Sequence, residues 1–431
     1  MNQKLYKFLN IENNKYKKIY LFQISLIFFV GILSIFFRHP MSWYDEQVHY
    51  ARVITYSNDL GSTSEGSIEK GEQELINQSM RTISKSLGEP TSEVISFHWS
   101  NGFKDISDTR IVKTKDGSPA AVYSPLVYSP YIVAAWISKM IGLHTISTFL
   151  FLRLIGFLTV FILFLFSIRK IPFAKAALIV IALIPTVTIS FTAISADTLT
   201  YGLLFLVISQ FMSIYQKVSL SSNIKSKEII SLIICSLFLT LAKMPAFAVL
   251  ALYIPLIYIG VKNAKLSRKQ NIILGMTFIL CIISALAWYM SIKNINGNLS
   301  YYGAKNIDQS KQFAVLLAHP LRTIRVFFEN ITNFPFFDFQ LGYSDNTKWT
   351  HVPVLISLFS VIGFISSFRI RDENQSIINR EERIIYNLSS KIIFLGIMLL
   401  IFLIFLLQST EVGSEAIVGI QGRYFFAFLP L

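Results

Sequence analysis

The chain has few charged residues and almost no cysteine. Only 15% of its 431 residues are Asp, Glu, Lys or Arg, whereas a soluble domain carries roughly 25%. Its two cysteines, Cys235 and Cys281, both lie within apolar runs and offer neither a disulfide framework nor a metal-ligand spacing. Glycine-rich phosphate loops and the Gly-x-Ser-x-Gly elbow are also missing from the sequence. These absences argue against a soluble nucleotide-dependent enzyme.

Long apolar runs make up most of the chain. Hydrophobic residues account for 53% of it, and the mean hydropathy is +0.53. A water-soluble core cannot absorb this much apolar sequence, whereas a helix that crosses a bilayer needs about 20 apolar residues. The sequence therefore predicts an all-α polytopic membrane protein. The predicted spans are 19–37, 148–168, 173–193, 198–216, 228–242, 246–260, 271–291, 352–368 and 391–408, with a tenth beginning near Phe425.

Positive charge is distributed unevenly between the two sides of these spans. About half of the 39 Lys and Arg residues lie in the segments 1–18, 169–175, 217–227, 262–269 and 369–391. This bias predicts a cytoplasmic N-terminus, and the first span, which has no convincing cleavage site, should remain as a helix. The predicted divisions are a basic N-terminus (1–18), the first span (19–37), an extracytoplasmic loop (38–147), a central bundle (148–291), a second extracytoplasmic loop (292–351) and C-terminal spans (352–431).

The net charge of +14 does not indicate nucleic-acid binding. Proteins that bind nucleic acid gather basic residues on one soluble face, whereas here they occupy short loops between apolar spans. We interpret them as topology signals in contact with anionic lipid. The partner that they predict is the lipid bilayer.

The two predicted extracytoplasmic loops are too long to be simple turns, and we expect them to cover a site on the outer face. Residues 57–92 are rich in Ser, Glu, Gly and Gln, which favours a mobile or partly helical excursion over a packed domain. The run Tyr131 to Leu143 is amphipathic and follows a proline-fixed stretch. It predicts an interfacial or re-entrant helix, with a full span as the alternative.

An acidic pair, Asp45-Glu46, lies about eight residues beyond the first span. On a helix, His49 would share a face with them, as the i+4 neighbour of Asp45 and the i+3 neighbour of Glu46. A carboxylate beside an imidazole suits a general base or a weak metal clamp. The same acids would also stabilise a helix N-terminus without any chemistry. Spacing alone leaves both interpretations open.

Further ionisable residues lie where lipid would disfavour them. Arg153 falls early in the second span, Asp197 at the end of a span, Lys243 beside Pro245, and Arg423 in the last motif of the chain. Ionisable residues at membrane depth are by default functional or paired. With a cytoplasmic N-terminus, Asp45, Asp197, Lys243 and Arg423 all fall at the outer face. Each also has an interpretation as an interfacial side chain or a structural ion pair.

The order of these motifs resembles a bacterial family of predicted membrane proteins, domain of unknown function 2142, from about residue 19 to the end. That family in turn resembles the GT-C glycosyltransferases. The most specific piece is Gln-Gly-Arg-Tyr. The motifs that carry the resemblance are Asp45-Glu46 with His49, Pro125-x-x-Tyr128-x-Pro130, Ser195-x-Asp197, Lys243-x-Pro245 and Gly419-x-Gln421-Gly422-Arg423-Tyr424.

The resemblance implies a GT-C-like bundle of about ten transmembrane helices in the bacterial plasma membrane. It implies a glycosyltransferase that moves a sugar from a polyprenyl-phosphate donor to an envelope polysaccharide or teichoic-acid-like acceptor. By this resemblance Asp45 is the catalytic base of an inverting reaction, supported by Glu46. A divalent cation, Mg or Mn, at Asp45 is an option for which the sequence lacks a full ligand set. The predicted substrate-binding residues are His49, Tyr128, Arg153, Asp197, Lys243, Gln421, Arg423 and Tyr424.

The sequence departs from the family pattern at two points, and two other functions are alternatives to a glycosyltransferase. Tyr44 stands where we associate the family with proline, and only a few residues of the tenth span precede Leu431. A transporter or flippase for a lipid-linked glycan also has intramembrane charge and Pro-broken helices, although its polar residues should lie near mid-bilayer. A non-catalytic scaffold for envelope assembly is the other alternative.

Overall fold

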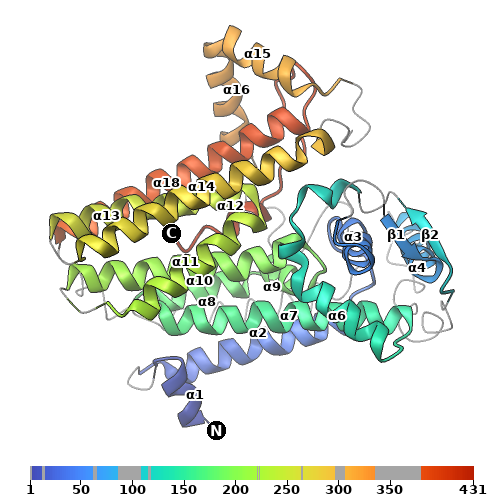
Figure 1. Ribbon diagram of the computed structural model, residues 1–431, viewed down its shortest axis with the longest axis horizontal. Helices are drawn as coiled ribbons and strands as arrows, with labels where there is room; N and C mark the ends of the chain where they lie inside the picture. The colour runs from blue at the N-terminus through green and yellow to red at the C-terminus, as the bar shows by residue number, and fades with distance from the viewer. Residues whose placement is uncertain are drawn as a thin grey trace.

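The computed structural model describes residues 2–11, 15–61, 66–85, 108–114, 118–220, 222, 224–263, 266–296, 306–334 and 380–431. Helices dominate it, beside one antiparallel pair of strands (Figure 1). The helices are α1 (Asn2–Phe8), α2 (Lys17–Phe37), α3 (Glu46–Asn58), α4 (Lys70–Lys85), α6 (Ser129–Met140), α7 (Thr145–Lys170), α8 (Lys175–Leu183), α9 (Pro185–Thr192), α10 (Ala196–Ser219), α11 (Ser226–Ala242), α12 (Met244–Phe247), α13 (Tyr253–Lys262), α14 (Arg268–Asn296), α15 (Gln309–Ala318), α16 (Pro320–Thr332), α18 (Arg380–Gln408) and α19 (Arg423–Phe426). The strands are β1 (Gly66–Glu69) and β2 (Ile111–Thr114), and the short 3-10 helices are η2 (Ser118–Val122), η3 (Pro125–Tyr128) and η4 (Ala248–Leu252).

Six helical segments of the described residues are long and apolar enough to cross a membrane, or seven if the bent pair α8 and α9 is one span. Four of them are the single helices α2, α7, α10 and α14, which contain predicted spans. The fifth joins α12 to α13, and the sixth, α18, begins well before the predicted span 391–408. The predicted span 228–242 lies within α11, which has 17 residues, and 352–368 lies outside the described residues. Near Phe425 the structure has only the short helix α19.

The predicted span 173–193 is not a straight helix. It is divided into α8 and α9, which meet at 74°. Pro185 is the first residue of α9 and has no N–H to continue the hydrogen bonds of α8. The Thr188 hydroxyl instead donates to the Ala182 carbonyl at 2.7 Å. The break directs the end of α9, and the backbone that follows it, toward the N-terminus of α3.

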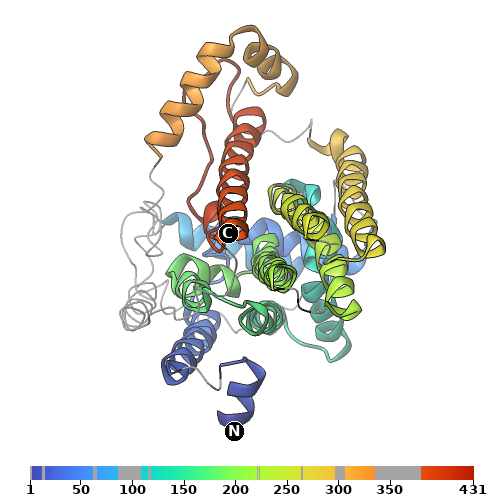
Figure 2. The same cartoon turned by 90° about the vertical axis from the view of Figure 1, so that its left-hand side faces the viewer.

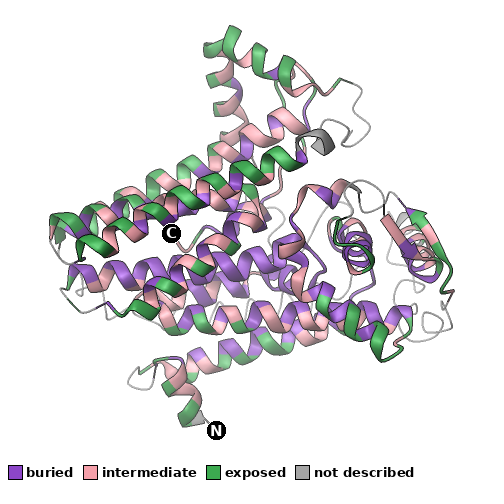
Figure 3. Ribbon diagram, in the orientation of Figure 1, coloured by how far each residue is buried: buried purple, intermediate pink, exposed green. Residues whose placement is uncertain are grey.

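The core is centred on α10. Of the residues in its most apolar stretch, 94% are buried. It packs against α7, α9, α11 and α13, and Figure 3 shows the buried residues concentrated here and the exposed ones along α14 and α18. Close packing of α6 on α7 depends on Gly156. A Cβ atom there would lie 2.6 Å from the hydroxyl of Tyr131, which donates to the Ala193 carbonyl at 2.7 Å.

The basic segments gather at one end of the bundle. Phe8 of α1 packs edge-on against Phe166, near the end of α7, and the Tyr215 hydroxyl of α10 donates to the Glu382 carbonyl of α18 at 2.8 Å. Lys262 of α13 also pairs with α18. The helices α3 and α6 lie at the opposite end (Figure 1), which we call the α3 end.

The α3 end carries a small ordered unit. The strand β1 pairs with β2, and α4 contacts α3, α7 and β1. Part of the segment 57–92, predicted to be mobile or partly helical, is thus a packed helix with Leu75 and Ile76 buried. Beside it, α6 has 12 residues and a length of about 18 Å, too short to cross the bilayer. Its exposed Trp136 and Met140 fit the interfacial interpretation.

A buried carboxyl in this unit predicts a pH-dependent stability. Burial raises the pKa of Glu72 to about 8 from 4.5, although Lys139 nearby lowers it. Between these values the unfolded chain loses the proton and the folded chain keeps it, so stability falls as the pH rises, by roughly 1.4 kcal/mol per pH unit. Hydrogen-exchange protection of α4 should decline over this range in the parent chain and not in Glu72→Gln. The same decline in the variant would contradict this origin.

The segment that leads to Arg423 is fastened by α16. The Arg322 guanidinium donates to the Gly413 carbonyl at 2.5 Å, and the Asn330 amide donates to the Glu415 carbonyl at 2.7 Å. Figure 2 shows α15 and α16 standing away from the bundle beside this segment. They belong to the predicted second loop, whose Trp349 lies outside the described residues.

Candidate functional site

Asp45 is the N-cap residue of α3 and has a left-handed backbone, with φ 59°. Residues other than glycine seldom adopt this conformation, and Asp and Asn tolerate it best. The side chain makes no capping hydrogen bond and is 47% exposed. Asp45 therefore does not act as a helix cap, and its carboxylate is open to solvent.

Glu46 is fully buried, and its carboxylate is saturated. Oε1 accepts hydrogen bonds from Arg153 Nε at 2.9 Å, Ile194 N at 3.0 Å and Arg38 Nη2 at 3.3 Å, while Oε2 accepts one from Arg153 Nη2 at 2.7 Å. Burial alone would raise the pKa of Glu46, but Arg153 and Arg38 hold it below its usual value. Glu46 is thus a buried anion held by Arg153 and Arg38, and its supporting catalytic role stays a prediction.

Arg153, a predicted substrate-binding residue, makes structural contacts among the described residues. Its side chain is fully buried, and its three nitrogens donate to Glu46 and to the carbonyls of Ile35, Arg38 and His39. Because these bonds occupy the guanidinium, none of its nitrogens is left for a ligand. Arg153 instead fastens the end of α2 and the start of α3 to α7.

Four residues that are distant in the sequence form one charged cluster at the α3 end. Asp197 follows Ser195, the N-cap of α10, whose hydroxyl accepts a hydrogen bond from the Asp197 N–H at 3.1 Å. The Asp197 carboxylate contacts Lys243 Nζ and lies 3.7 Å from Arg423 Nε. Arg423 Nη2 in turn lies 3.7 Å from Asp45 Oδ2. We call Asp45, Asp197, Lys243 and Arg423 the charged cluster.

Arg423 sits in an aromatic cage and has unpartnered donors. Its guanidinium carbon lies 4.5 Å from the ring centre of Tyr44, 5.3 Å from Tyr424 and 5.8 Å from Trp43. The residue is 4% exposed, and Nε and Nη1 have no hydrogen-bond acceptor among the described residues. Buried donors without acceptors are costly. The cage therefore suits an anionic ligand that supplies those acceptors.

Arg423 and Tyr424, the first two residues of α19, are held by contacts with α10 and α18. The Tyr201 hydroxyl of α10 donates to the Arg423 carbonyl at 2.5 Å. The Tyr424 ring stacks on Phe405, and its centre lies 4.6 Å from Lys243 Nζ. Gly419 has φ +92°, which favours glycine. The Gln421 side-chain oxygen is buried and has no hydrogen-bond donor within the described part of the chain, so Gln421 stays a candidate for ligand contact.

His49 and Tyr128 form a pair beside the charged cluster. His49 Nδ1 lies 2.5 Å from the Tyr128 hydroxyl. Burial lowers the pKa of His49 to about 4, against the opposite effects of Asp45 and Asp197, so the imidazole is neutral at pH 7. Tyr128 is fully buried and contacts His49, and its contact with substrate stays a prediction.

Arg38 and Trp43 were not among the predicted site residues. Tyr44 was noted only because it replaces the proline associated with the family. Arg38 donates to Glu46 and lies 5.7 Å from the ring centre of Trp43, whose other contact of this kind is Arg423. A signal was present, because Arg38 is a cation at the end of the first span on the side that is poor in basic residues.

The residues do not suit a resident divalent cation. No group of three His, Cys, Asp or Glu side chains that could hold a metal ion occurs in the described ranges. Both candidate carboxylates, Asp45 and Asp197, face Arg423, and a cation placed between them would meet its positive charge.

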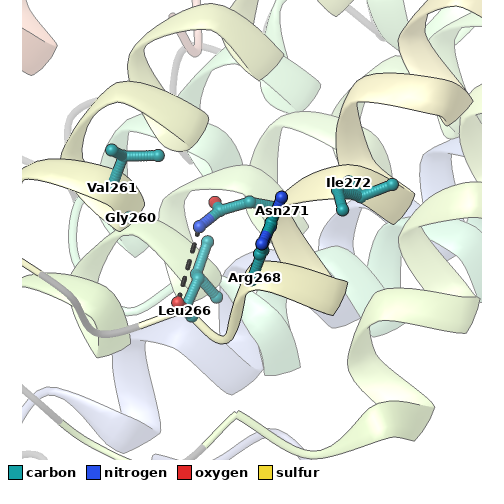
Figure 4. Close-up of a pocket in the computed structure, with 6 residues that line it drawn as sticks. All are labelled: Gly260, Val261, Leu266, Arg268, Asn271 and Ile272. Carbon is teal, nitrogen blue, oxygen red and sulfur yellow. Dashed lines mark hydrogen bonds between the residues drawn. The ribbon is translucent and has the colours of Figure 1, made fainter.

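A shallow groove of about 460 Å³ lies between α13 and α14, at the end of the bundle opposite α3. Its lining is mainly apolar, and Asn271 donates to the Leu266 carbonyl there (Figure 4). No residue of the charged cluster lines it. The lining residues are Gly260, Val261, Leu266, Arg268, Asn271 and Ile272.

Comparison with known proteins identifies a family. No curated protein and no solved structure gives a significant match. The family described as predicted membrane protein (DUF2142) matches residues 28–431. This match includes Asp45, the second half of α2 with all the later spans, and the Arg423 motif. The chain therefore belongs to the DUF2142 family of predicted membrane proteins.

Proposed function

We propose that this chain is a GT-C-type glycosyltransferase of the bacterial plasma membrane, which transfers a sugar from a polyprenyl-phosphate donor to a cell-envelope glycan. One observation carries the proposal. The half-exposed carboxylate of Asp45 faces the buried guanidinium of Arg423, whose Nε and Nη1 have no acceptor among the described residues. A base beside an unfilled anion site is what phosphate-leaving-group transfer requires.

The location of the site supports a lipid-carried donor. The basic segments gather at the end of the bundle opposite α3, and a cytoplasmic location of that end follows from the positive-inside rule. The charged cluster then faces the extracytoplasmic side, where nucleotide sugars are absent. A donor anchored in the membrane by its own lipid reaches such a site within the bilayer plane.

The balance of charge favours a donor with a single phosphate. The charged cluster and the ion pairs of Glu46 together contain four cations, Arg38, Arg153, Lys243 and Arg423, and three carboxylates, Asp45, Glu46 and Asp197. They leave one positive charge, which a phosphodiester neutralises. A diphosphate donor would leave excess negative charge in a partly desolvated site, which is unfavourable.

The same balance is kept through the reaction. An acceptor hydroxyl attacks the anomeric carbon from the face opposite the phosphate and gives its proton to Asp45. The new carbon–oxygen bond forms with inversion as the bond to the phosphate oxygen breaks, and the lipid phosphate departs with a second negative charge. Protonation of Asp45 removes one negative charge from the protein, so the complex stays neutral. Arg423 stabilises the departing phosphate, and Lys243 holds Asp197 in place.

The test is the surface glycan of cells that lack this chain, compared with the same cells carrying the parent chain. We expect the deletion to remove one sugar substituent and to accumulate its lipid-linked donor, both restored by the parent. The measurement is sugar composition of the envelope polysaccharide together with mass spectrometry of the polyprenyl lipids.

Other outcomes distinguish the alternatives. Loss of the whole polymer with an accumulated lipid-linked glycan would favour a flippase. A glycan and lipid pool that are unchanged by the deletion would contradict the transferase.

A further inference from the structure

His49 is held between the charged cluster and a group of buried tyrosines. Its ring is 7% exposed, and the only hydrogen bond of its side chain within the described ranges joins Nδ1 to the Tyr128 hydroxyl at 2.5 Å. Tyr123 packs on one side at 5.6 Å between ring centres. The charged groups that influence it are Asp45, Asp197, Lys243 and Arg423.

The surroundings of Tyr128 decide which group donates in this pair. A neutral imidazole carries one proton, on Nδ1 or on Nε2. If Nδ1–H donated to Tyr128, the hydroxyl hydrogen of this fully buried tyrosine would have no acceptor among the residues that the structure describes. If Tyr128 donates to Nδ1 instead, its hydroxyl hydrogen is paired, and the donor left open is the His49 Nε2–H, which is not among the fully buried unpartnered atoms. The second arrangement places the imidazole proton on Nε2.

We propose that Tyr128 is a positioning residue that fixes His49 as the Nε2–H tautomer, and that this N–H donates to the phosphate of the lipid donor. The first half stands on the geometry alone, and the second rests on the proposed function. His49 is then a neutral donor and does not serve as the base.

A neutral donor fits the charge of the site. Burial keeps the pKa of His49 near 4 despite Asp45 and Asp197 beside it, so the imidazole adds no charge to the charged cluster or to the ion pairs of Glu46 next to it. Its contribution is a correctly directed Nε2–H, because the hydrogen bond from Tyr128 sets the orientation of the ring. Sequence spacing had suggested His49 as the partner of a base, and this arrangement makes it a hydrogen-bond donor to the leaving group.

The tautomer is tested without any substrate. The full chain, labelled with ¹⁵N-histidine and reconstituted in lipid, contains six histidines, and the signal lost in His49→Gln identifies His49 by solid-state NMR. We expect an unprotonated Nδ1 and a protonated Nε2 from about pH 6 to pH 8. Tyr128→Phe should give a mixture of tautomers, whereas Tyr56→Phe, a change in a neighbouring buried tyrosine, should not. A protonated Nδ1 in the parent chain would overturn the proposal.

The role toward phosphate is tested by binding of polyprenyl monophosphate. His49→Leu should weaken binding about tenfold, the effect of one hydrogen bond to a charged group, and His49→Gln, which keeps an N–H, should restore most of it. Tyr128→Phe should weaken binding in the parent chain and have no further effect in His49→Gln. An equal loss in both backgrounds would make Tyr128 merely structural. Unchanged binding in His49→Leu would contradict the role of His49 toward phosphate. Unchanged binding in Arg423→Gln as well would mean that the phosphate donor itself is wrong, whatever the tautomer.

Discussion

Replacement of Asp45 by Asn is expected to reduce sugar transfer by about 10³-fold or more without loss of folded protein, because a general base contributes about 10²- to 10⁴-fold. Asn has nearly the same shape as Asp and tolerates the left-handed backbone at this position. It cannot accept the proton of the attacking hydroxyl. It also removes a negative charge that faces Arg423, so affinity for polyprenyl monophosphate should be retained or increase.

The measurement for Asp45→Asn is restoration of the glycan in cells that lack the parent chain, at matched membrane levels. Asp59→Asn is the control, because Asp59 lies at the other end of the same helix, is exposed and accepts, among the described residues, a side-chain hydrogen bond from Gly61 N–H alone. Asp59→Asn should restore the glycan fully. Normal transfer by Asp45→Asn would remove the base from the mechanism.

Replacement of Arg153 by Leu is expected to destabilise the fold by about 3 to 5 kcal/mol, the usual cost of leaving a buried charge without its partner. Glu46 would keep only Arg38 and the Ile194 N–H, and three backbone carbonyls would each lose a donor. Arg153→Lys should lie between the parent and Leu, since an ammonium cannot reproduce the bidentate contact. The free energy of unfolding in mixed micelles titrated with SDS measures this effect.

The control for Arg153 is Arg325→Leu, which breaks an exposed ion pair with Glu329 and should leave the free energy of unfolding unchanged. Replacing Glu46 by Leu in the Arg153→Leu background should recover part of the loss, because it removes the unpaired charge. A fully stable Arg153→Leu chain that fails only in binding polyprenyl phosphate would return Arg153 to the substrate site.

Six of the predicted spans lie in helical segments long and apolar enough to cross a membrane, and they were predictable because hydrophobic length is a local property that the bilayer enforces on every crossing. The grouping of Asp45, Asp197, Lys243 and Arg423 was also predictable, since alternating spans bring every second loop to the same face. The break at Pro185 could be suspected from the residue itself, whereas the 74° between α8 and α9 depends on what they pack against.

The sequence by itself determined a mainly helical membrane chain, the gathering of its motifs at one end and the residue types available for chemistry. Only the tertiary structure decided their surroundings. Asp45 and Glu46 are adjacent and chemically alike, yet the left-handed turn at Asp45 leaves one carboxylate exposed, while the other is buried against Arg153. Likewise Arg153 and Arg423 are both buried arginines, and the number of acceptors around each separates the residue with structural contacts from the candidate ligand site. Such differences arise from contacts between distant segments, which no local pattern records.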